Sequence, residues 1–361
     1  MKDKPQNNPE AVDVAAAEPV PAETAMQGFR RANSAERRAM SYISKYESPA
    51  GLAPLPRPQW LPERVWPFQT QALEFEGARI AVTDVGKGPV LLFVHTGMWS
   101  FVWRDVMLRL AQDFRCVCFD APGCGQSDRL PSRAITLEKA SRALTAVIHA
   151  LDLNDITLIV HDLGGPSGIV GALRVPERIR AICAVNAFAW KPSGLLFRGM
   201  LGFIGNPAVR EVSAWTGILT RITSSAFGVG KNMDVASRKA FLDGVGRRGL
   251  RAFHSYLRDA RRARAIYDEL SLALVGPFSR LPLLTIFGER NDPLGFQPRW
   301  KQLFPTARQI VVSKGNHFPM CDDPDLVATS ICELHRDHVA PALGHDLPAH
   351  PHFVSPERME K

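Results

Sequence analysis

Residues 160–165 read VHDLGG and place a carboxylate where an apolar run (156–160) ends and a helix-like segment (165–173) begins. A strand, a sharp turn and a helix with one reactive side chain at the apex form the layout of a nucleophile elbow. A carboxylate at the apex needs no proton removed before it attacks, so it can displace a leaving group at saturated carbon and form an ester with the enzyme. We therefore predict that Asp162 is a nucleophile.

Other polar residues also follow apolar runs. Thr96, Gly97 and Trp99 come after 90–94, Asp292 after 283–287, and His317 after 309–312. Ligands of open α/β sheets bind at the carboxyl ends of the strands, so these groups should meet Asp162 there. The pattern predicts His317 as general base on water and Asp292 as the acid that orients its ring. Glu289 stays open as an alternative acid, and Asn186 marks a second position at which the acid could stand.

The elements needed to position these groups are a parallel sheet and the helices around it. Strand-like runs at 72–76, 79–82, 90–94, 116–119, 156–160, 181–185, 283–287 and 309–312 alternate with helical stretches at 103–112, 137–151, 165–173 and 297–304. This alternation predicts an α/β fold with a mostly parallel, doubly wound sheet. The long helical interval before 283 predicts a cap over the site. We expect a tail and Pro-rich arm (1–60), a core in two parts (61–188 and 278–340), a helical cap (189–277) and a flexible tail (341–361).

Between about residues 70 and 335 the chain resembles the α/β-hydrolase superfamily. The resemblance rests on the elbow at Asp162, the run DAPGCGQSD at 120–128, Asp292 after a strand, Gly-Asn-His317, and the chain order nucleophile, acid, histidine. Within the superfamily it is most similar to haloalkane dehalogenases and epoxide hydrolases, which use an Asp nucleophile. The resemblance implies a covalent alkyl ester on Asp162, an oxyanion site at the Leu163 N–H and the 96–98 loop, and no metal or organic cofactor.

Two departures keep the reaction open. Dehalogenases usually carry Trp after the nucleophile to hold the halide, whereas this chain has Leu163. Trp99, Trp103, Trp190 or Trp215 could supply the N–H instead. Epoxide hydrolases protonate the ring oxygen with cap tyrosines, and Tyr256 and Tyr267, eleven residues apart, could share one helical face. We expect carbon–halogen cleavage first and epoxide opening second, with a β-lactone or ester substrate and a non-catalytic ligand-binding role as further alternatives.

Composition bounds the remaining expectations. The net charge is +8, with arginine clusters at 30–38 and 238–264 that nucleic acid or an anionic membrane could use, although solvated helix faces are the simpler interpretation. The sequence has no run of about 18 apolar residues, so no transmembrane segment is predicted. Six cysteines without ligand spacing indicate buried thiols in a reducing compartment, so we expect a cytoplasmic protein that binds a small apolar substrate and water, and no nucleic acid. Residues 26–45 could form a basic amphipathic helix, and the oligomeric state stays open.

Overall fold

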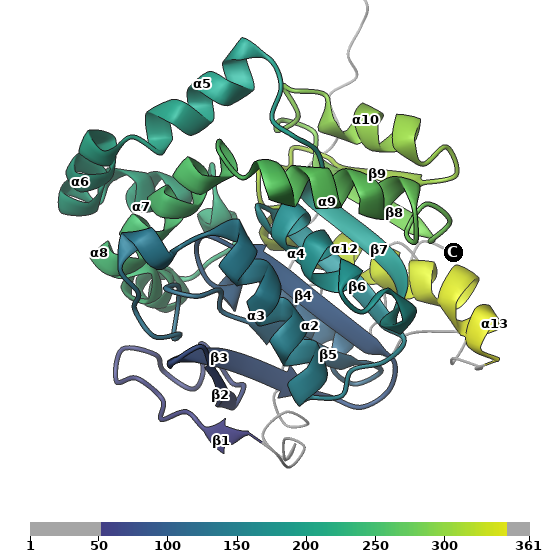
Figure 1. The fold of residues 1–361 in the computed structure, drawn as a ribbon. Helices are drawn as coiled ribbons and strands as arrows, with labels where there is room; N and C mark the ends of the chain where they lie inside the picture. The colour runs from purple at the N-terminus through teal and green to yellow at the C-terminus, as the bar shows by residue number, and fades with distance from the viewer. Residues whose placement is uncertain (1–51, 345–361) are drawn as a thin grey trace, which may run out of the picture.

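The computed structural model describes residues 52–344. Their strands form a single sheet in the order β1-β2-β3-β5-β4-β6-β7-β8-β9 (Figure 1). The first three strands pair antiparallel, and β4 to β9 run parallel. The strands are β1 (Ala53–Pro54), β2 (Thr70–Phe75), β3 (Ala78–Val85), β4 (Val90–Thr96), β5 (Arg115–Phe119), β6 (Ile156–Asp162), β7 (Ile179–Ala187), β8 (Leu283–Gly288) and β9 (Arg308–Val312). The eight strands expected from the sequence are all present, and the predicted α/β-hydrolase fold is confirmed.

Helices cover both faces of the sheet because its central strands are apolar on both sides. On one face, α3 packs against α4 and α4 against α9; on the other, α2 packs against α12 (Figure 1). The helices of the described residues are α2 (Arg104–Leu110), α3 (Leu137–Ala150), α4 (Gly164–Leu173), α5 (Leu195–Ile204), α6 (Pro207–Thr216), α7 (Ile218–Thr223), α8 (Val235–Ala260), α9 (Arg264–Val275), α10 (Phe296–Leu303), α11 (Pro319–Asp322), α12 (Pro324–Leu334) and α13 (Ala340–Leu343). None of these helices is long and apolar enough to cross a membrane.

The Pro-rich segment is an arm that packs on the core. Trp66 and Phe68 are buried, and the Trp66 ring lies against Trp99 and Phe101. The guanidinium of Arg57 donates to the carbonyls of Trp66 and Phe68, which fixes the arm's path. The described part of the arm therefore adds an aromatic cluster beside the loop that follows β4. The expected tail and basic helix at residues 1–51 lie outside the described residues.

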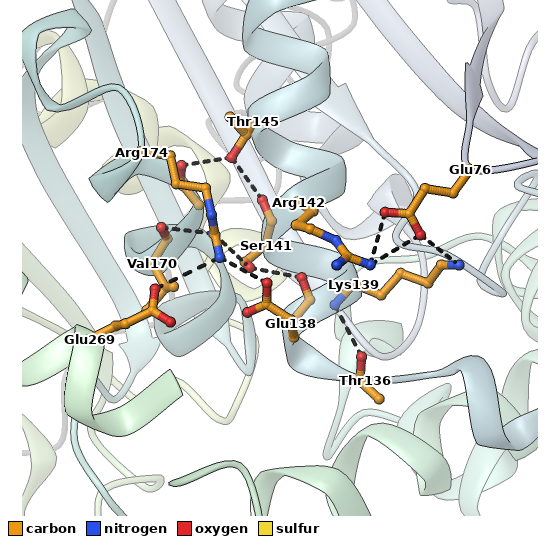
Figure 2. Close-up of polar contacts among 11 residues, drawn as sticks. Glu76, Thr136, Glu138, Lys139, Ser141, Arg142, Thr145, Val170, Arg174 and Glu269 are labelled. Atoms are coloured by element: carbon orange, nitrogen blue, oxygen red, sulfur yellow. Dashed lines mark hydrogen bonds and ion pairs between the residues drawn. The ribbon is translucent and has the colours of Figure 1, made fainter. Parts of the chain in front are cut away.

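Helix α4, which carries the residues after the predicted nucleophile, is bound to its neighbours by Arg174 at its carboxyl end. Figure 2 shows the Arg174 guanidinium between Glu138 of α3 and Glu269 of α9, at 2.9 and 3.7 Å. Arg174 also donates to the hydroxyl of Ser141, and the Thr145 hydroxyl lies between the Ser141 and Gly171 carbonyls. These contacts hold α4 in register with α3, and with it the turn that starts the helix.

Between β7 and β8 the chain forms α5 to α9. Helices α5, α6 and α7 pack on α8, and α5 and α6 lie at the outer edge of the molecule (Figure 1). Tyr256 and Tyr267, which could have shared one helical face, lie on different helices, because α8 ends at Ala260 and α9 begins at Arg264. The predicted limits of a cap at 189 and 277 remain a prediction.

Candidate active site

Asp162 stands at the turn between β6 and α4 with φ of +49°, a left-handed conformation that non-glycine residues rarely adopt. Two glycines allow this turn to be tight. A Cβ on Gly164 would lie 2.6 Å from the Val94 carbonyl oxygen, and one on Gly165 would lie 2.1 Å from that of Phe188. The structure therefore has the strand, the strained apex and the closely packed helix of a nucleophile elbow.

Hydroxyl groups fix the peptide that follows the nucleophile. The Ser167 hydroxyl donates to the Leu163 carbonyl at 2.8 Å, so its oxygen is left to accept from the Thr96 hydroxyl, also at 2.8 Å. Thr96 is the neighbour of Asp162 across the β4–β6 pair. The Thr96 hydroxyl is thus used to orient the turn. The Leu163 N–H interacts with the Asp162 carboxylate, in the position expected of an oxyanion donor.

The Asp162 carboxyl is only partly covered, with 22% of its side chain exposed. Burial alone would raise its pKa, but the interaction with His317 and the Leu163 N–H together outweigh burial and bring that pKa below its usual value. The Asp162 side chain is therefore an ionised, accessible carboxylate near neutral pH, which is the state that a nucleophile needs.

The His317 imidazole faces Asp162 across 3.8 Å, from Nε2 to Oδ2. Its other nitrogen, Nδ1, lies 2.8 Å from the Oδ1 atom of Asn291. The structure thus brings the predicted nucleophile and base together. It does not bring Asp292 to the histidine. The Asp292 carboxylate instead accepts from the backbone N–H groups of Phe296 and Gln297, at the start of α10.

Asp292 is thus corrected from the acid that orients His317 to a helix-capping residue. Burial raises the pKa of its carboxyl, and the two N–H groups partly offset that effect. The alternative acid Glu289 is exposed and accepts from the Lys314 N–H. The residue that faces His317 is Asn291, which sequence reasoning missed because the expected group was a carboxylate.

Asn186, noted from the sequence as an alternative acid position, supports Asn291. It is skipped in the β6–β7 register and has φ of +39°, so the bulge turns its side chain toward the loops after β8 and β9. Its Oδ1 accepts from the Gly288 N–H, and its Nδ2 donates toward the carbonyls of Asn316 and His317. Backbone groups therefore leave no choice in how the Asn186 amide is oriented.

This orientation fixes the protonation of the base. The Nδ2 of Asn186 also donates to Asn291 Oδ1 at 3.1 Å, so the oxygen of Asn291 faces His317. His317 Nδ1 must then carry a proton and donate it, which leaves Nε2 as the nitrogen that can exchange a proton on the Asp162 side. The tautomer is the one that a general base requires, although an amide and not a carboxylate sets it.

Two buried histidines connect the base to the nucleophile strands. His161 Nε2 donates to the His317 carbonyl at 2.8 Å, so its Nδ1 must accept from His95 Nδ1–H at 3.0 Å. Burial first, and then the charge of His317, lowers the pKa of His95 to about 3 and holds that of His161 well below its usual value. Both rings are therefore neutral supports.

The remaining predicted residues lie around this centre. Gly97 has φ of +119°, and its Cα packs against the Phe253 ring of α8. Trp99 is fully buried, and its indole N–H finds no acceptor among the described residues. Trp190 packs on α10, with the Arg299 guanidinium 4.5 Å from its ring. The indole N–H of Trp103 is likewise buried without an acceptor among the described residues, so Trp99 and Trp103 are better candidates for a leaving-group donor than Trp190.

Tyr256 and Tyr267, the predicted cap tyrosines, both use their hydroxyls in hydrogen bonds to the backbone. Tyr256 donates to the Pro122 carbonyl at 2.8 Å and Tyr267 to the Ala260 carbonyl at 2.7 Å, and both rings are buried. Among the residues described, no cluster of three His, Cys, Asp or Glu side chains is arranged to hold a metal ion. The six cysteines are buried free thiols, as expected.

Comparison with known proteins places the chain. A family model described as "Alpha/beta hydrolase family" matches residues 91–330. The chain belongs to the α/β-hydrolase family. Membership of this family, together with the names of the relatives described below, identifies the protein as a hydrolase. A solved structure of a loop variant of haloalkane dehalogenase DbeA from Bradyrhizobium elkanii has the same fold, with a TM-score of 0.64 at 18% identity over 76% of this chain and 99% of that one.

Two curated relatives cover most of the chain. Haloalkane dehalogenase 2 of Mycobacterium tuberculosis is 25% identical over 277 residues, which span 75% of this chain and 96% of that protein. The cis-3-alkyl-4-alkyloxetan-2-one decarboxylase of Shewanella oneidensis is 26% identical over 281 residues, or 73% and 87% of the two chains. Over a shorter stretch of 107 residues, 29% of this chain and 35% of that protein, the haloalkane dehalogenase of Agrobacterium fabrum is 36% identical.

Proposed function

We propose that this hydrolase cleaves a carbon–halogen bond in a small apolar molecule through an ester on Asp162. The observation that carries the proposal is an ionised carboxylate at a strained elbow, with an imidazole 3.8 Å away whose Nε2 faces it and whose Nδ1 faces the Asn291 oxygen. An Asp162 oxygen attacks the carbon as the halide leaves with the bonding electrons. His317 Nε2 then takes a proton from water, whose oxygen attacks the ester carbonyl carbon, while the Leu163 N–H stabilises the oxyanion.

The leaving halide would be held by Trp99 in this proposal. Its buried indole N–H has no acceptor among the described residues, and an unpaired buried donor costs about 1–3 kcal/mol. An anion beside it would satisfy that donor. Leu163, at the usual Trp position, offers only its backbone N–H.

A second candidate is opening of a β-lactone, an oxetan-2-one. Two observations favour it: the Shewanella oneidensis relative, and the amide in place of a carboxylate beside His317. Asp162 would attack the saturated ring carbon that is bonded to the ring oxygen. The bond between that carbon and the ring oxygen would break, which gives a free carboxylate. Loss of CO₂ would then form a C=C bond and expel Asp162 as a carboxylate. This route uses no water, so it needs no strongly activated base. Epoxide opening has less support, because both cap tyrosines donate to backbone carbonyls.

The test is adduct trapping in the His317→Gln variant. The variant is incubated with a panel of bromoalkanes and alkyl oxetanones, and the intact protein is weighed. With a bromoalkane we expect a mass gain of one alkyl group, mapped to Asp162 by peptide sequencing, with one halide released per protein; with an oxetanone, whose route does not use His317, we expect continued turnover to alkene and CO₂. The Asp162→Asn/His317→Gln double variant is the matched control and should gain nothing.

The wild-type products separate the two candidates. Dehalogenation gives an alcohol whose oxygen comes from water after the first turnover, together with halide. Lactone opening gives an alkene and CO₂, with no oxygen from solvent. An unlabelled protein and no product from either substrate class would contradict the proposed function.

A further inference from the structure

Helices α6 and α7 bury small and hydroxyl-bearing side chains and expose large apolar ones. Helix α6 buries Ser213 and Ala214, while Val212 and Trp215 are 62% and 74% exposed. Helix α7 buries threonines and leaves two isoleucines more than half exposed. A helix on the surface of a water-soluble domain normally turns its apolar side inward. The outward side of these helices therefore has the character of a surface that something covers.

Helix α5 continues this surface. Leu196, Met200 and Phe203 lie three and four residues apart, so they share one helical face, and all three are exposed, whereas Phe197 and Leu201 pack inward. Helix α5 contacts α6, and α6 contacts α7. In Figure 1, α5 and α6 form the outer edge of the molecule. We call the exposed side chains of α5, α6 and α7 the cap apolar surface; its largest members are Leu196, Phe203, Val212, Trp215, Ile218 and Ile222.

Positive charge surrounds this surface. Residues 191–264 contain fourteen Lys and Arg but only four Asp and Glu, a net charge of +10, whereas the whole chain has +8. The rest of the chain therefore has a net charge of −2, so the cationic character belongs to this segment. Arg198 and Arg221 are exposed on α5 and α7 and form no ion pair among the described residues. The Arg247 guanidinium lies 5.5 Å from the Trp215 ring.

The four acids of this segment are already engaged. Glu211 pairs with Arg210 and Arg251, and Asp243 pairs with Lys239. Asp234 accepts from the Ser237 N–H at the start of α8, and Asp259 accepts from the Leu137 N–H. The segment thus offers cations beside apolar and aromatic side chains, with its anions used internally.

Charge decides between the candidate occupants. A second copy of the chain would bring the same +10 segment against itself. Residues 28–45 carry five Lys and Arg and one Glu, so they too are repelled. Nucleic acid would satisfy the arginines but leave Phe203, Ile218 and Ile222 against phosphates. We propose that the cap apolar surface docks on an anionic lipid membrane surface, with its apolar side chains among the acyl chains and its arginines at the phosphates.

The experiment is sedimentation of the full-length protein with vesicles. One set of vesicles is made of phosphatidylcholine alone, and in the other set about 30% of the lipid is phosphatidylglycerol. We expect binding to the anionic vesicles that weakens in 0.5 M salt. Phe203→Ser and Trp215→Ser should each lower the partition coefficient about tenfold. Each substitution removes a large apolar side chain that would lie among the acyl chains when the protein is bound. Arg198→Glu/Arg221→Glu should lower it at least about tenfold.

Controls keep the result specific. Val311→Ser changes a side chain of β9 that is 54% exposed and lies outside the cap, and it should leave binding unchanged. Of the tryptophans in the described residues, Trp215 is the most exposed, so brominated lipid should quench an emission that the Trp215→Phe variant lacks. Urea unfolding of each variant checks that the fold is intact.

Four results would overturn the proposal. The first is no binding to anionic vesicles. The second is binding that Phe203→Ser and Trp215→Ser leave unchanged. The third is equal binding to duplex DNA that depends only on the arginines. The fourth is a lipid-free dimer by sedimentation velocity that Trp215→Ser converts to monomer, which would assign the surface to a second copy. Because binding is read without turnover, its failure would not bear on the proposed reaction.

Discussion

The two halves of the candidate active site differ in how far they match the chemistry expected of them. The nucleophile half, from β6 and α4, has its carboxylate, its strained turn and its supporting hydroxyls at Thr96 and Ser167. The base half, from the loops after β7, β8 and β9, has a histidine oriented by Asn291 and Asn186, two neutral amides. The proposed formation of an ester on Asp162 therefore has the carboxylate that it needs, whereas the proposed hydrolysis of that ester lacks the negative charge that usually stabilises an imidazolium.

The strongest test of this contrast is Asp162→Asn. The substitution keeps the shape of the side chain and removes the attacking charge, so we expect turnover to fall by about 10⁴-fold or more, as for other catalytic residues that act as a unit. The measurement is steady-state product release, with circular dichroism to confirm folding. Turnover at the wild-type rate would show that the nucleophile half has been misidentified.

The buried histidines His95 and His161, which connect the two halves, should make the free energy of unfolding depend on pH under acidic conditions. The folded-state pKa of His95 is about 3 and that of His161 also lies well below 6.5, so between about pH 6.5 and 3 the unfolded chain binds more protons than the folded one. Stability is therefore present above pH 6.5 and is lost as the pH falls. We expect a slope of roughly 1.4 kcal/mol per pH unit for each histidine.

Urea unfolding at pH 7, 6 and 5 measures this slope. The His161→Gln variant keeps a donor for the His317 carbonyl, and its stability should fall less steeply with acid. His149→Gln removes an exposed histidine and is the matched control, whose slope should equal that of the wild type. Identical slopes for His161→Gln and wild type would mean that the buried pair does not carry the acid sensitivity.

The Asn291→Asp variant tests whether the base half lacks only a negative charge beside His317. A carboxylate at this position would still accept from His317 Nδ1 and from Asn186 Nδ2, and it would add the missing charge beside the ring. If hydrolysis of the ester limits turnover, the rate should rise about 10- to 100-fold, most visibly as faster decay of the Asp162 adduct in single-turnover experiments. An unchanged decay would favour the lactone route, in which no water is activated.

The sequence predicted the sheet and the sharp turn at Asp162 well because each rests on a local pattern. Apolar runs set the strands, and the sequence at 160–165 encodes the elbow through glycines that the close approach of β4 requires. The partner of His317 was not predictable in the same way. Asp292 and Asn291 are adjacent, and which of them faces the ring depends on a bulge at Asn186 and on the start of α10, both set by distant strands. The tyrosines were misplaced because residues 261–263 interrupt what looked like one helix.

Asp292→Ala gives the smallest effect and separates the two neighbouring residues. The Asp292 carboxylate accepts two N–H groups at the start of α10, so its loss should cost about 1 kcal/mol of unfolding free energy, measured by urea titration. Because this carboxylate does not contact His317, turnover below the unfolding transition should stay within about twofold of the wild type. A large loss of turnover with stability retained would mean that His317 turns to Asp292 during the reaction. In that case the base half would have its charge after all, and the contrast between the two halves would disappear.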